Sequence, residues 1–401
     1  MFSYFVKTCI AFRMDLITDT KTLEAFCDRL ANETFVTVDT EFMREKTYWP
    51  ILCLVQLGGK DEASCVDVLA DGIDLTPLYD LMANEKVLKV FHAARQDVEI
   101  FVKLTGQTPM PMFDTQVAAM VCGFGESVGY ETLVNTICKK NLDKGSRFTD
   151  WSKRPLTSRQ ITYALGDVTH LRDIYEKLMR TLESNNRAGW LEEEMTALTS
   201  ESTYIVDPDT AWKRLKARTK STKVLAVLRE VAAWREREAQ RKDMPRNRVI
   251  RDDALIEIAH HTPTDAQALE RVRGMNKSIA QGRYGSEILA AIKTALEMAP
   301  ADYPKPPAKK DLPKGLGPVV DLMKVLLKFK CEHNDVAQKL VANAADLEQL
   351  AAYGKEAGVP CLKGWRRKLF GDDAIKLKEG NLALAVRGKN IKVIDLDKTE
   401  S

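Results

Sequence analysis

The first half of the chain alternates short β-type runs with helical runs. Three apolar runs rich in β-branched and aromatic residues, at 35–42, 51–57 and 64–69, follow one another closely. Their spacing predicts three strands joined as an antiparallel meander. Two shorter runs, at 87–91 and 113–114, each precede a helical pattern and predict two more strands. Strands followed by strand–helix alternation predict an α/β fold, a mixed sheet with helices on its faces.

Helical periodicity dominates the rest of the chain, with amphipathic stretches at 225–239 and 250–260 and a longer helical region at 319–370. A stretch rich in proline and lysine interrupts this pattern and is typical of a linker. These patterns predict five segments: an N-terminal extension at 1–13, an α/β domain at 14–205, a small all-α module at 210–298, a linker at 299–318 and a second all-α module at 319–385.

Composition supports a globular protein of two or three domains. The chain has 401 residues, 45% of them apolar, and a net charge of only +3, so any nucleic-acid affinity must come from local patches. Its eight cysteines are scattered without a CxxC pair, which favours reduced residues in a cytosolic protein over a zinc site or a disulfide framework. No run of about 18 apolar residues exists, so no membrane span is expected. The segment before Met14 is interpreted as a disordered extension.

The first candidate site residues are Asp39 and Glu41, two positions apart on a predicted strand. Alternate residues of a strand point to the same face, so these two carboxylates lie side by side. Neighbouring carboxylates repel each other unless a cation lies between them, which points to a metal site. An exposed edge or the solvated end of a strand would explain the pair equally well.

Three further candidates lie on predicted helices. Asp97 falls in the first turn of a helix, where an acid also complements the helix dipole. Tyr163 and Asp167 are four residues apart and therefore share one helical face. A packed tyrosine beside a solvated aspartate is the simpler reading of that pair, so neither feature is informative by itself.

The combination is specific. An Asp-x-Glu strand, an Asp early in a later helix and a Tyr-x3-Asp helix resemble the DEDD superfamily of exonucleases, in its tyrosine-bearing branch. Neighbouring segments narrow the resemblance to the ribonuclease D family. They are VDTEF at 38–42, TYWP at 47–50, LVQL at 54–57, FHAARQD at 91–97, FDTQ at 113–116, DWSKRPL at 150–156 and YALGD at 163–167.

The resemblance implies an RNase H-like exonuclease domain that uses two Mg²⁺ or Mn²⁺ ions. Asp39, Glu41 and Asp167 would share the metal next to the attacking water, with Asp39 bridging to a second metal. Asp97 would support that second metal, and Tyr163 would align the water on the phosphate. The implied product is a nucleoside 5′-monophosphate released from a 3′-hydroxyl end.

The helical part adds to the resemblance. Segments WRERE at 234–238 and DMPR at 243–246 resemble the helicase-and-RNase-D C-terminal (HRDC) domain, although alternating charges also fit a salt-bridged helix. The second module is expected to be HRDC-like. There Trp365 and its basic neighbours would stack on a base and bind phosphate, or else form a solvated basic face. Those neighbours are Lys363, Arg366, Arg367 and Lys368.

Four residues are candidate RNA contacts: Thr40 between the two acids, Trp49 after the first strand, His92 at a strand end, and Arg154. Three of them have a structural alternative: a strand-forming residue for Thr40, a packed loop aromatic for Trp49 and a core histidine for His92. A phosphate-tracking groove is expected to use the basic residues Arg44, Lys46, Lys153 and Arg154.

These observations predict a 3′→5′ exoribonuclease that acts on single-stranded 3′ ends of RNA, including tRNA precursors. The resemblance also implies a cytoplasmic monomer. A DNA-directed exonuclease is one alternative, because no motif reads the 2′-hydroxyl. A non-catalytic nucleic-acid-binding protein is another, and the presence of all four acids and the tyrosine disfavours it.

Overall fold

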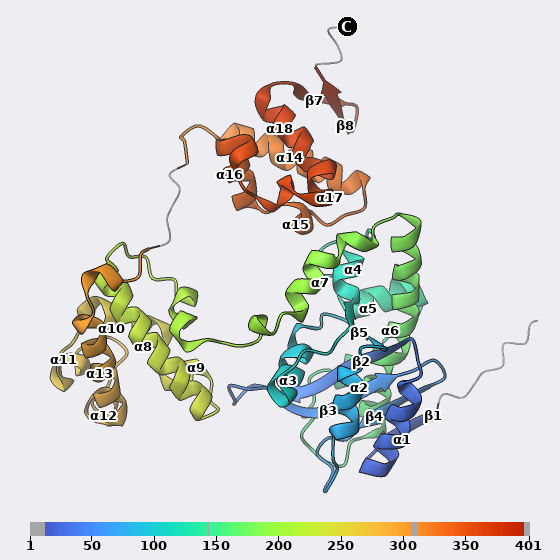
Figure 1. Cartoon of the computed structure of the whole chain (residues 1–401), viewed down its shortest axis with the longest axis horizontal. Helices are drawn as coiled ribbons and strands as arrows, with labels where there is room; N and C mark the ends of the chain where they lie inside the picture. The colour runs from blue at the N-terminus through green and yellow to red at the C-terminus, as the bar shows by residue number, and fades with distance from the viewer. Residues whose placement is uncertain (1–12, 143, 307–311, 397–401) are drawn as a thin grey trace, which may run out of the picture.

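A six-stranded mixed sheet forms the centre of the N-terminal part in the computed structural model, which describes residues 13–142, 144–306 and 312–396 (Figure 1). The strand order is β1-β4-β3-β2-β5-β6. The strands are β1 (Arg13–Ile17), β2 (Phe35–Met43), β3 (Ile51–Gly58), β4 (Glu62–Val66), β5 (Leu88–Phe91) and β6 (Met112–Asp114).

The expected meander is confirmed, since β2 pairs antiparallel with β3 and β3 with β4. Strands β5 and β6 extend the sheet in parallel from β2, as βα alternation requires. Strand β1 was missed by the sequence analysis. It begins at Arg13, within the segment assigned to an extension, and pairs in parallel with β4. The other residues of that segment, 1–12, lie outside the described part of the chain.

Helices cover the two faces of the sheet differently. Helices α1 (Thr20–Leu30), α2 (Thr76–Ala83) and α3 (Arg95–Thr105) bury apolar side chains against Val36 and Val38. The long helix α6 (Ser158–Ser184) packs on the opposite face, against β2, β3 and β4. Because side chains alternate along β2, its odd-numbered residues, including Asp39 and Glu41, point towards α6.

The first helical module contains α8 (Thr222–Arg241), α9 (Arg246–Val249), α10 (Asp252–His261) and α13 (Arg283–Glu297) around its own core. It contacts the loop between β2 and β3 through hydrogen bonds and a small buried cluster of Tyr48, Ala239 and Val249. The Tyr48 hydroxyl donates to Glu236 and accepts from Arg246 at 2.8 Å. Asp243 accepts from the backbone amides of Tyr48 and Trp49 at 3.0 and 2.9 Å. The first helical module therefore binds Tyr48 through its hydroxyl and its backbone amide, and Trp49 through its backbone amide.

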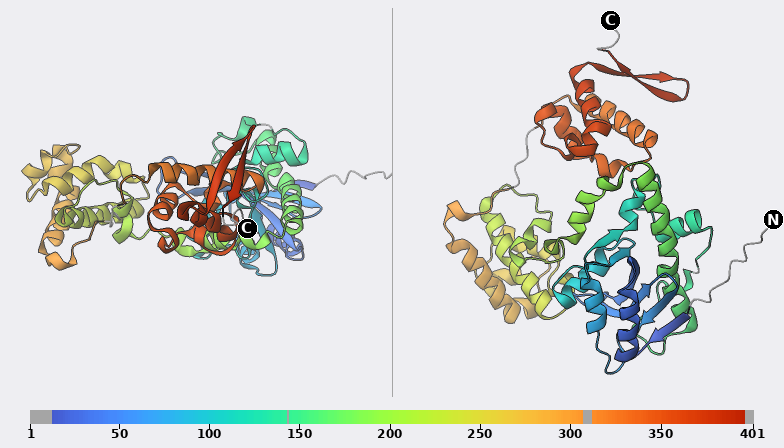
Figure 2. Two further views of the ribbon diagram at one scale, coloured as in Figure 1. Left: turned by 90° about the horizontal axis from the view of Figure 1, so that it is seen from above. Right: turned by 45° about the vertical axis from the view of Figure 1, so that its right-hand side comes forward.

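The second helical module is less regular than the helical run at 319–370 suggested. It contains α14 (Gly317–His333), α15 (Gln338–Val341), α16 (Ala344–Tyr353) and α18 (Asp372–Glu379), and ends in a hairpin of β7 (Leu382–Arg387) and β8 (Asn390–Asp395). Figures 1 and 2 show this module on a different side of the sheet domain from the first. Its core is continuous with that domain: Leu178 and Leu182 of α6 belong to one buried cluster with Leu326 and Leu340.

Arg366 links the second helical module to the sheet domain. It is 3% exposed, donates to the Leu340 carbonyl at 2.5 Å, and pairs with Glu193 and Glu194 of α7 (Glu192–Thr199) at 2.5 and 3.0 Å. Trp365 stacks on Trp190 with ring centroids 4.2 Å apart. The expectation that Arg366 contacts phosphate or solvent is therefore wrong, because its guanidinium is enclosed between the two domains.

Seven cysteines lie within the described residues, and all of them are free thiols. Five are buried, as expected from their apolar sequence context. Among the described helices, none combines the length and the apolar character needed to cross a bilayer.

Arg366→Leu is expected to lower the free energy of unfolding by about 2 kcal/mol, since it leaves the buried Leu340 carbonyl without its donor. Urea denaturation followed by tryptophan fluorescence measures the change. The matched control is Arg367→Leu, which removes the next arginine, 59% exposed and paired with the exposed Asp372. The control is expected to change stability by less than about 0.5 kcal/mol. Equal losses in both variants would contradict the anchoring role of Arg366.

Candidate active site

Strand β2 places two acids at the middle of the sheet. Asp39 lies opposite Gln56 and Glu41 opposite Leu54 on β3, so both side chains rise from the same face. The register shifts between Glu41 and Phe42, where β2 leaves regular pairing. The acids thus sit where the strand opens towards solvent, and each is half-buried.

Helix α6 brings Tyr163 and Asp167 over the same face. Its start is fixed by a capping box, in which Thr157 and Gln160 satisfy each other's backbone amides. Further along, the Thr37 hydroxyl of β2 donates to the Val168 carbonyl at 2.8 Å. A Cβ on Gly58 would lie 2.4 Å from the Thr37 hydroxyl oxygen, so only glycine permits this contact. The residue next to Asp167 is therefore tied directly to the strand that carries Asp39.

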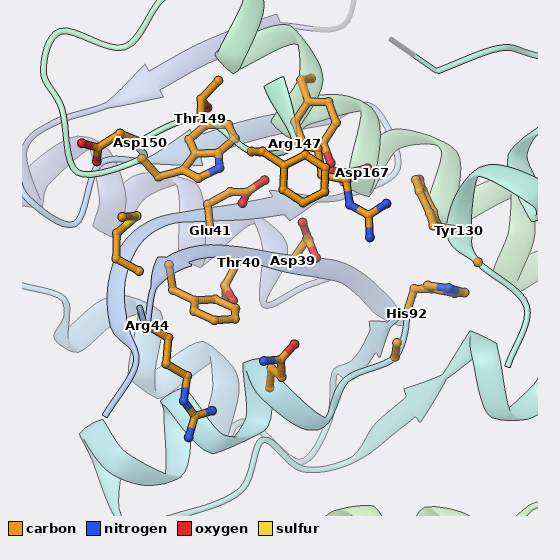
Figure 3. Close-up of a pocket in the computed structure, with 18 of the residues that line it drawn as sticks. Asp39, Thr40, Glu41, Arg44, His92, Tyr130, Arg147, Thr149, Asp150 and Asp167 are labelled. Carbon is orange, nitrogen blue, oxygen red and sulfur yellow. The ribbon is translucent and has the colours of Figure 1, made fainter. Parts of the chain in front are cut away.

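The result is a cluster of three carboxylates. One oxygen each from Asp39, Glu41 and Asp167 lie within 4.8 Å of one another. They line a cleft of about 1120 Å³, together with Tyr163, His92 and Arg147. Figure 3 shows Asp39, Glu41 and Asp167 turned towards one another across the cleft.

The fourth acid, Asp97, lies beside this cluster and is 7% exposed. The Thr40 hydroxyl donates to it at 2.5 Å. Thr40 also lines the cleft, so its side chain orients Asp97 from the strand that bears the other two acids. This contact places the α3 carboxylate next to Asp39, whose charge contributes to the raised pKa of Asp97 after burial itself.

Electrostatics in the cluster are unfavourable for four negative charges. Burial raises the pKa of Glu41 to about 10, with further contributions from Asp39 and Asp167. Burial and then Asp167 raise the pKa of Asp39. Burial raises the pKa of Asp167 to about 7, while a hydrogen bond from Tyr163 and the charge of Arg147 limit the rise. Each acid is penalised for ionising, so the site favours a bound cation at neutral pH.

The residues present fit a hard divalent cation. The cluster consists of carboxylates alone, with no histidine or cysteine in it. Oxygen-only ligation suits Mg²⁺ and Mn²⁺ rather than zinc. The site is open on the cleft side, so substrate oxygens can complete the coordination.

His92 and Tyr130 form another wall of the cleft. His92 Nδ1 lies 3.0 Å from the Thr115 hydroxyl, and its ring rests 5.5 Å from that of Tyr130. Its Nε2 has no hydrogen-bond partner among the residues that the structure describes. Burial lowers the pKa of His92 and favours the neutral imidazole. Nε2 is itself buried, so this nitrogen is not exposed to a ligand in the cleft.

The turn that presents His92 depends on Asp114. Its carboxylate accepts from the amides of Ala93 at 3.1 Å and Ala94 at 2.9 Å, and it caps α4 (Thr115–Ala119). Ala93 adopts a left-handed φ of 58°, which this double acceptor stabilises. Asp114 was recognised in sequence only as part of a motif, without a role.

Two candidate RNA contacts lie away from the cleft. Trp49 packs edge-on against Tyr48, with the Lys103 ammonium 4.2 Å from its ring centroid. Arg154 pairs with Asp67 at 2.7 Å and donates to the carbonyls of Trp151 and Cys53. Both side chains are engaged within the protein, as the packed-aromatic alternative expected for Trp49.

The predicted basic groove is mixed in character. Arg44 and Lys46 line the cleft, but Arg44 forms two hydrogen bonds to Glu99 at 2.6 and 2.7 Å. Lys46 and Lys153 are exposed. A cation that the sequence analysis missed, Arg147, lies much closer to the acids, and Figure 3 shows it alongside Asp167. Its signal in the sequence was a basic residue next to an aromatic one in an otherwise polar turn.

Comparisons with known proteins agree with this geometry. A family described as 3′-5′ exonuclease matches residues 14–183, and the HRDC domain matches residues 224–292. Ribonuclease D of Granulibacter bethesdensis is 50% identical over 380 residues, which cover 94% of this chain and 96% of that protein. Ribonuclease D of Nitrobacter hamburgensis is also 50% identical, over 95% of this chain and 99% of that protein.

Among solved structures, Escherichia coli RNase D, described as an exoribonuclease involved in structured RNA processing, superposes with a TM-score of 0.80. It is 29% identical, and the match covers 92% of this chain and 99% of that one. The likeness therefore extends over the sheet domain and both helical modules.

Asp39→Asn is expected to stabilise the metal-free protein. A carboxyl group whose pKa is raised in the folded state lowers the stability of the protein as pH rises from the group's ordinary pKa, 4.5 for Glu41, towards its pKa in the folded state, about 10. Removing one charge relieves this loss by about 2 kcal/mol at pH 8. Melting curves in EDTA from pH 5 to pH 9 measure it, and Mn²⁺ is expected to stabilise the wild type but not the variant.

Asp150→Asn serves as the control, because Asp150 lines the same cleft but its pKa is lowered by hydrogen bonds from Ser152. Its melting temperature in EDTA is expected to stay equal to or slightly below that of the wild type. A stabilising effect as large as that of Asp39→Asn would sink the repulsion argument.

Proposed function

The chain belongs to the ribonuclease D family of 3′→5′ exoribonucleases, and from that premise we propose that Asp39, Glu41, Asp97 and Asp167 hold its catalytic metal ions. The observation that carries the proposal is the convergence of three carboxylate oxygens within 4.8 Å, below the Tyr163 face of α6. Four such carboxylates would suit two Mg²⁺ or Mn²⁺ ions.

When bound, these ions stabilise the charge that develops on the phosphate and on the leaving oxygen. The protein's part is to position groups around them. Asp39 and Glu41 are fixed by the ladder with β3, Asp97 by Thr40, and Asp167 by the contact between Thr37 and Val168. Such preorganisation lowers the barrier because little reorientation is left to the moment of reaction.

Tyr163 is the residue that we assign to the attacking water. Its phenol lines the cleft, and burial followed by the charge of Asp167 raises its pKa well above the ordinary value. A phenol that stays protonated is a poor base at neutral pH but a good hydrogen-bond partner. Tyr163 therefore orients the water towards the phosphate rather than removing its proton.

Arg147 lies near enough to influence both Tyr163 and Asp167. It lines the cleft and has a delocalised cation that suits a phosphate oxygen. We assign it to the phosphate of the bound strand, and His92, which lines the same cleft, as a further contact of the RNA. Thr40 contacts the terminal nucleotide from between the two acids.

The substrate class follows from the family. RNA with a single-stranded 3′ end enters the cleft, and the products are nucleoside 5′-monophosphates. Precursors of tRNA and other structured RNAs are the proposed natural substrates, in agreement with the description of the Escherichia coli relative. We further propose a cytoplasmic monomer in which residues 14–205 catalyse, while the modules at 210–298 and 319–385 bind RNA on either side of a linker at 299–318.

Tyr163→Phe is expected to lower kcat by about 100-fold while leaving the stabilisation by Mn²⁺ intact, because it removes alignment of the water but no metal ligand. Asp39→Asn is expected to abolish both. The assay uses 5′-labelled single-stranded RNA and the matching DNA, each with Mg²⁺, Mn²⁺ or EDTA, and chromatography identifies the released nucleotide.

Tyr79→Phe is the matched control, since Tyr79 is a half-buried tyrosine on α2. It is expected to retain full activity. Stepwise shortening of RNA from the 3′ end that is lost in EDTA supports the proposal. Shortening of DNA at an equal rate contradicts the RNA assignment, and activity of Asp39→Asn contradicts the metal site.

A further inference from the structure

We propose that the turn Ser146–Thr149 is a nucleotide seat, in which the Phe148 ring stacks on a base of one of the two nucleotides that flank the scissile phosphate. The inference rests on the proposed function. It adds a positioning residue for the substrate that lies outside the acid cluster and carries no metal.

Phe148 is the most exposed large apolar side chain that the structure describes, at 92%. Exposing an aromatic ring of this size to water forgoes a burial free energy of a few kcal/mol. Scattered aliphatic side chains on a surface need no explanation, but this ring lies in the cleft that also holds Asp39, Glu41 and Tyr163. Phe148 is therefore exposed inside the cleft through which the proposed substrate passes.

The ring is held in this position by its own turn. The Thr149 amide donates to the Ser146 carbonyl at 3.2 Å, and the Thr149 hydroxyl donates to the same carbonyl at 2.8 Å. Ser146 is 2% exposed, and the Gln160 side chain of α6 donates to the Thr149 hydroxyl at 3.2 Å. The turn is thus tied to the helix that carries Tyr163, and its two central residues project outwards.

Those two central residues are complementary to a nucleotide. The Arg147 guanidinium lies 5.3 Å from the Phe148 ring centroid and reaches towards Asp167 (Figure 3). A cation next to an aromatic ring matches a phosphate next to a base, which is the repeating unit of a single strand. Every base has a π-face, so a stacking ring accepts all four, as an enzyme that removes successive nucleotides requires.

A double-mutant cycle between protein and substrate tests the contact. Wild type and Phe148→Ala are compared on 5′-labelled single-stranded RNA of one sequence. The RNA carries either all its bases or a single abasic nucleotide at the last, second-last or fourth position from the 3′ end. We expect Phe148→Ala to lower kcat/KM on intact RNA by roughly 10-fold, mainly through KM, because loss of one base–aromatic stack produces an effect of this order.

The abasic substrates decide the assignment. An abasic last or second-last nucleotide is expected to lower kcat/KM for the wild type and to erase the difference from Phe148→Ala, while an abasic fourth nucleotide leaves that difference unchanged. Phe148→Trp is expected to keep the kcat/KM of the wild type on intact RNA, whereas Phe148→Leu is expected to lower it as Phe148→Ala does. Equal loss by Phe148→Ala on all four substrates, or rescue by leucine, overturns stacking in favour of a structural role.

Ile205→Ala is the matched control, because Ile205 is another exposed apolar side chain, at 61%, that is not among the residues lining the cleft. It is expected to behave like the wild type. Fluorescence anisotropy with the same RNAs separates this proposal from the proposed function. If the wild type trims no RNA, the exonuclease assignment fails, while a binding loss on Phe148→Ala that an abasic nucleotide erases still supports the seat.

Discussion

Four carboxylates that repel one another are held together at the centre of the sheet, and the contacts around them oppose that repulsion. Strand β2 supplies two of the acids from one face, and its neighbours restrict where they can go. Thr37, Thr40 and Gly58 are small residues. They let α6 and α3 approach β2 closely enough to bring Asp167 and Asp97 beside the two acids of the strand. The fold therefore holds an unfavourable interaction that a bound cation or protonation relieves, and the scaffold must be stable enough to tolerate it.

The two helical modules meet this scaffold in different ways. The first has its own apolar core and touches the sheet domain through hydrogen bonds that join Tyr48 to Glu236 and Arg246, and through a small buried cluster of Tyr48, Ala239 and Val249. The second shares its apolar core with α6 and adds the buried Arg366. This contact, with its hydrogen bonds and its small buried cluster, positions the loop next to the cleft. An apolar seam makes the second module part of the same folding unit as the catalytic sheet.

Sequence reasoning was most successful where periodicity and chemistry coincide. The spacing of Asp39 and Glu41 on a strand, and of Tyr163 and Asp167 on a helix, already determined that each pair shares a face. Strand β1 was missed because its partner, β4, is distant in sequence and the strand is short. The burial of Arg366 depends on α7, more than 170 residues away, so no local pattern could reveal it. Phe148 and Arg147 were not predicted as site residues, because the sequence of a polar turn does not show which part of the protein the turn faces.

The shared core also has a consequence for the order of events during synthesis. Leu178 and Leu182 emerge from the ribosome well before Met323 and Leu326, which belong to the same buried cluster in the finished protein. The intervening stretch takes on the order of 10 s to translate, and throughout that time the cluster lacks the residues that the second module supplies. The sheet domain is therefore translated first, but a nascent chain acquires its complete core only when its final third has been made.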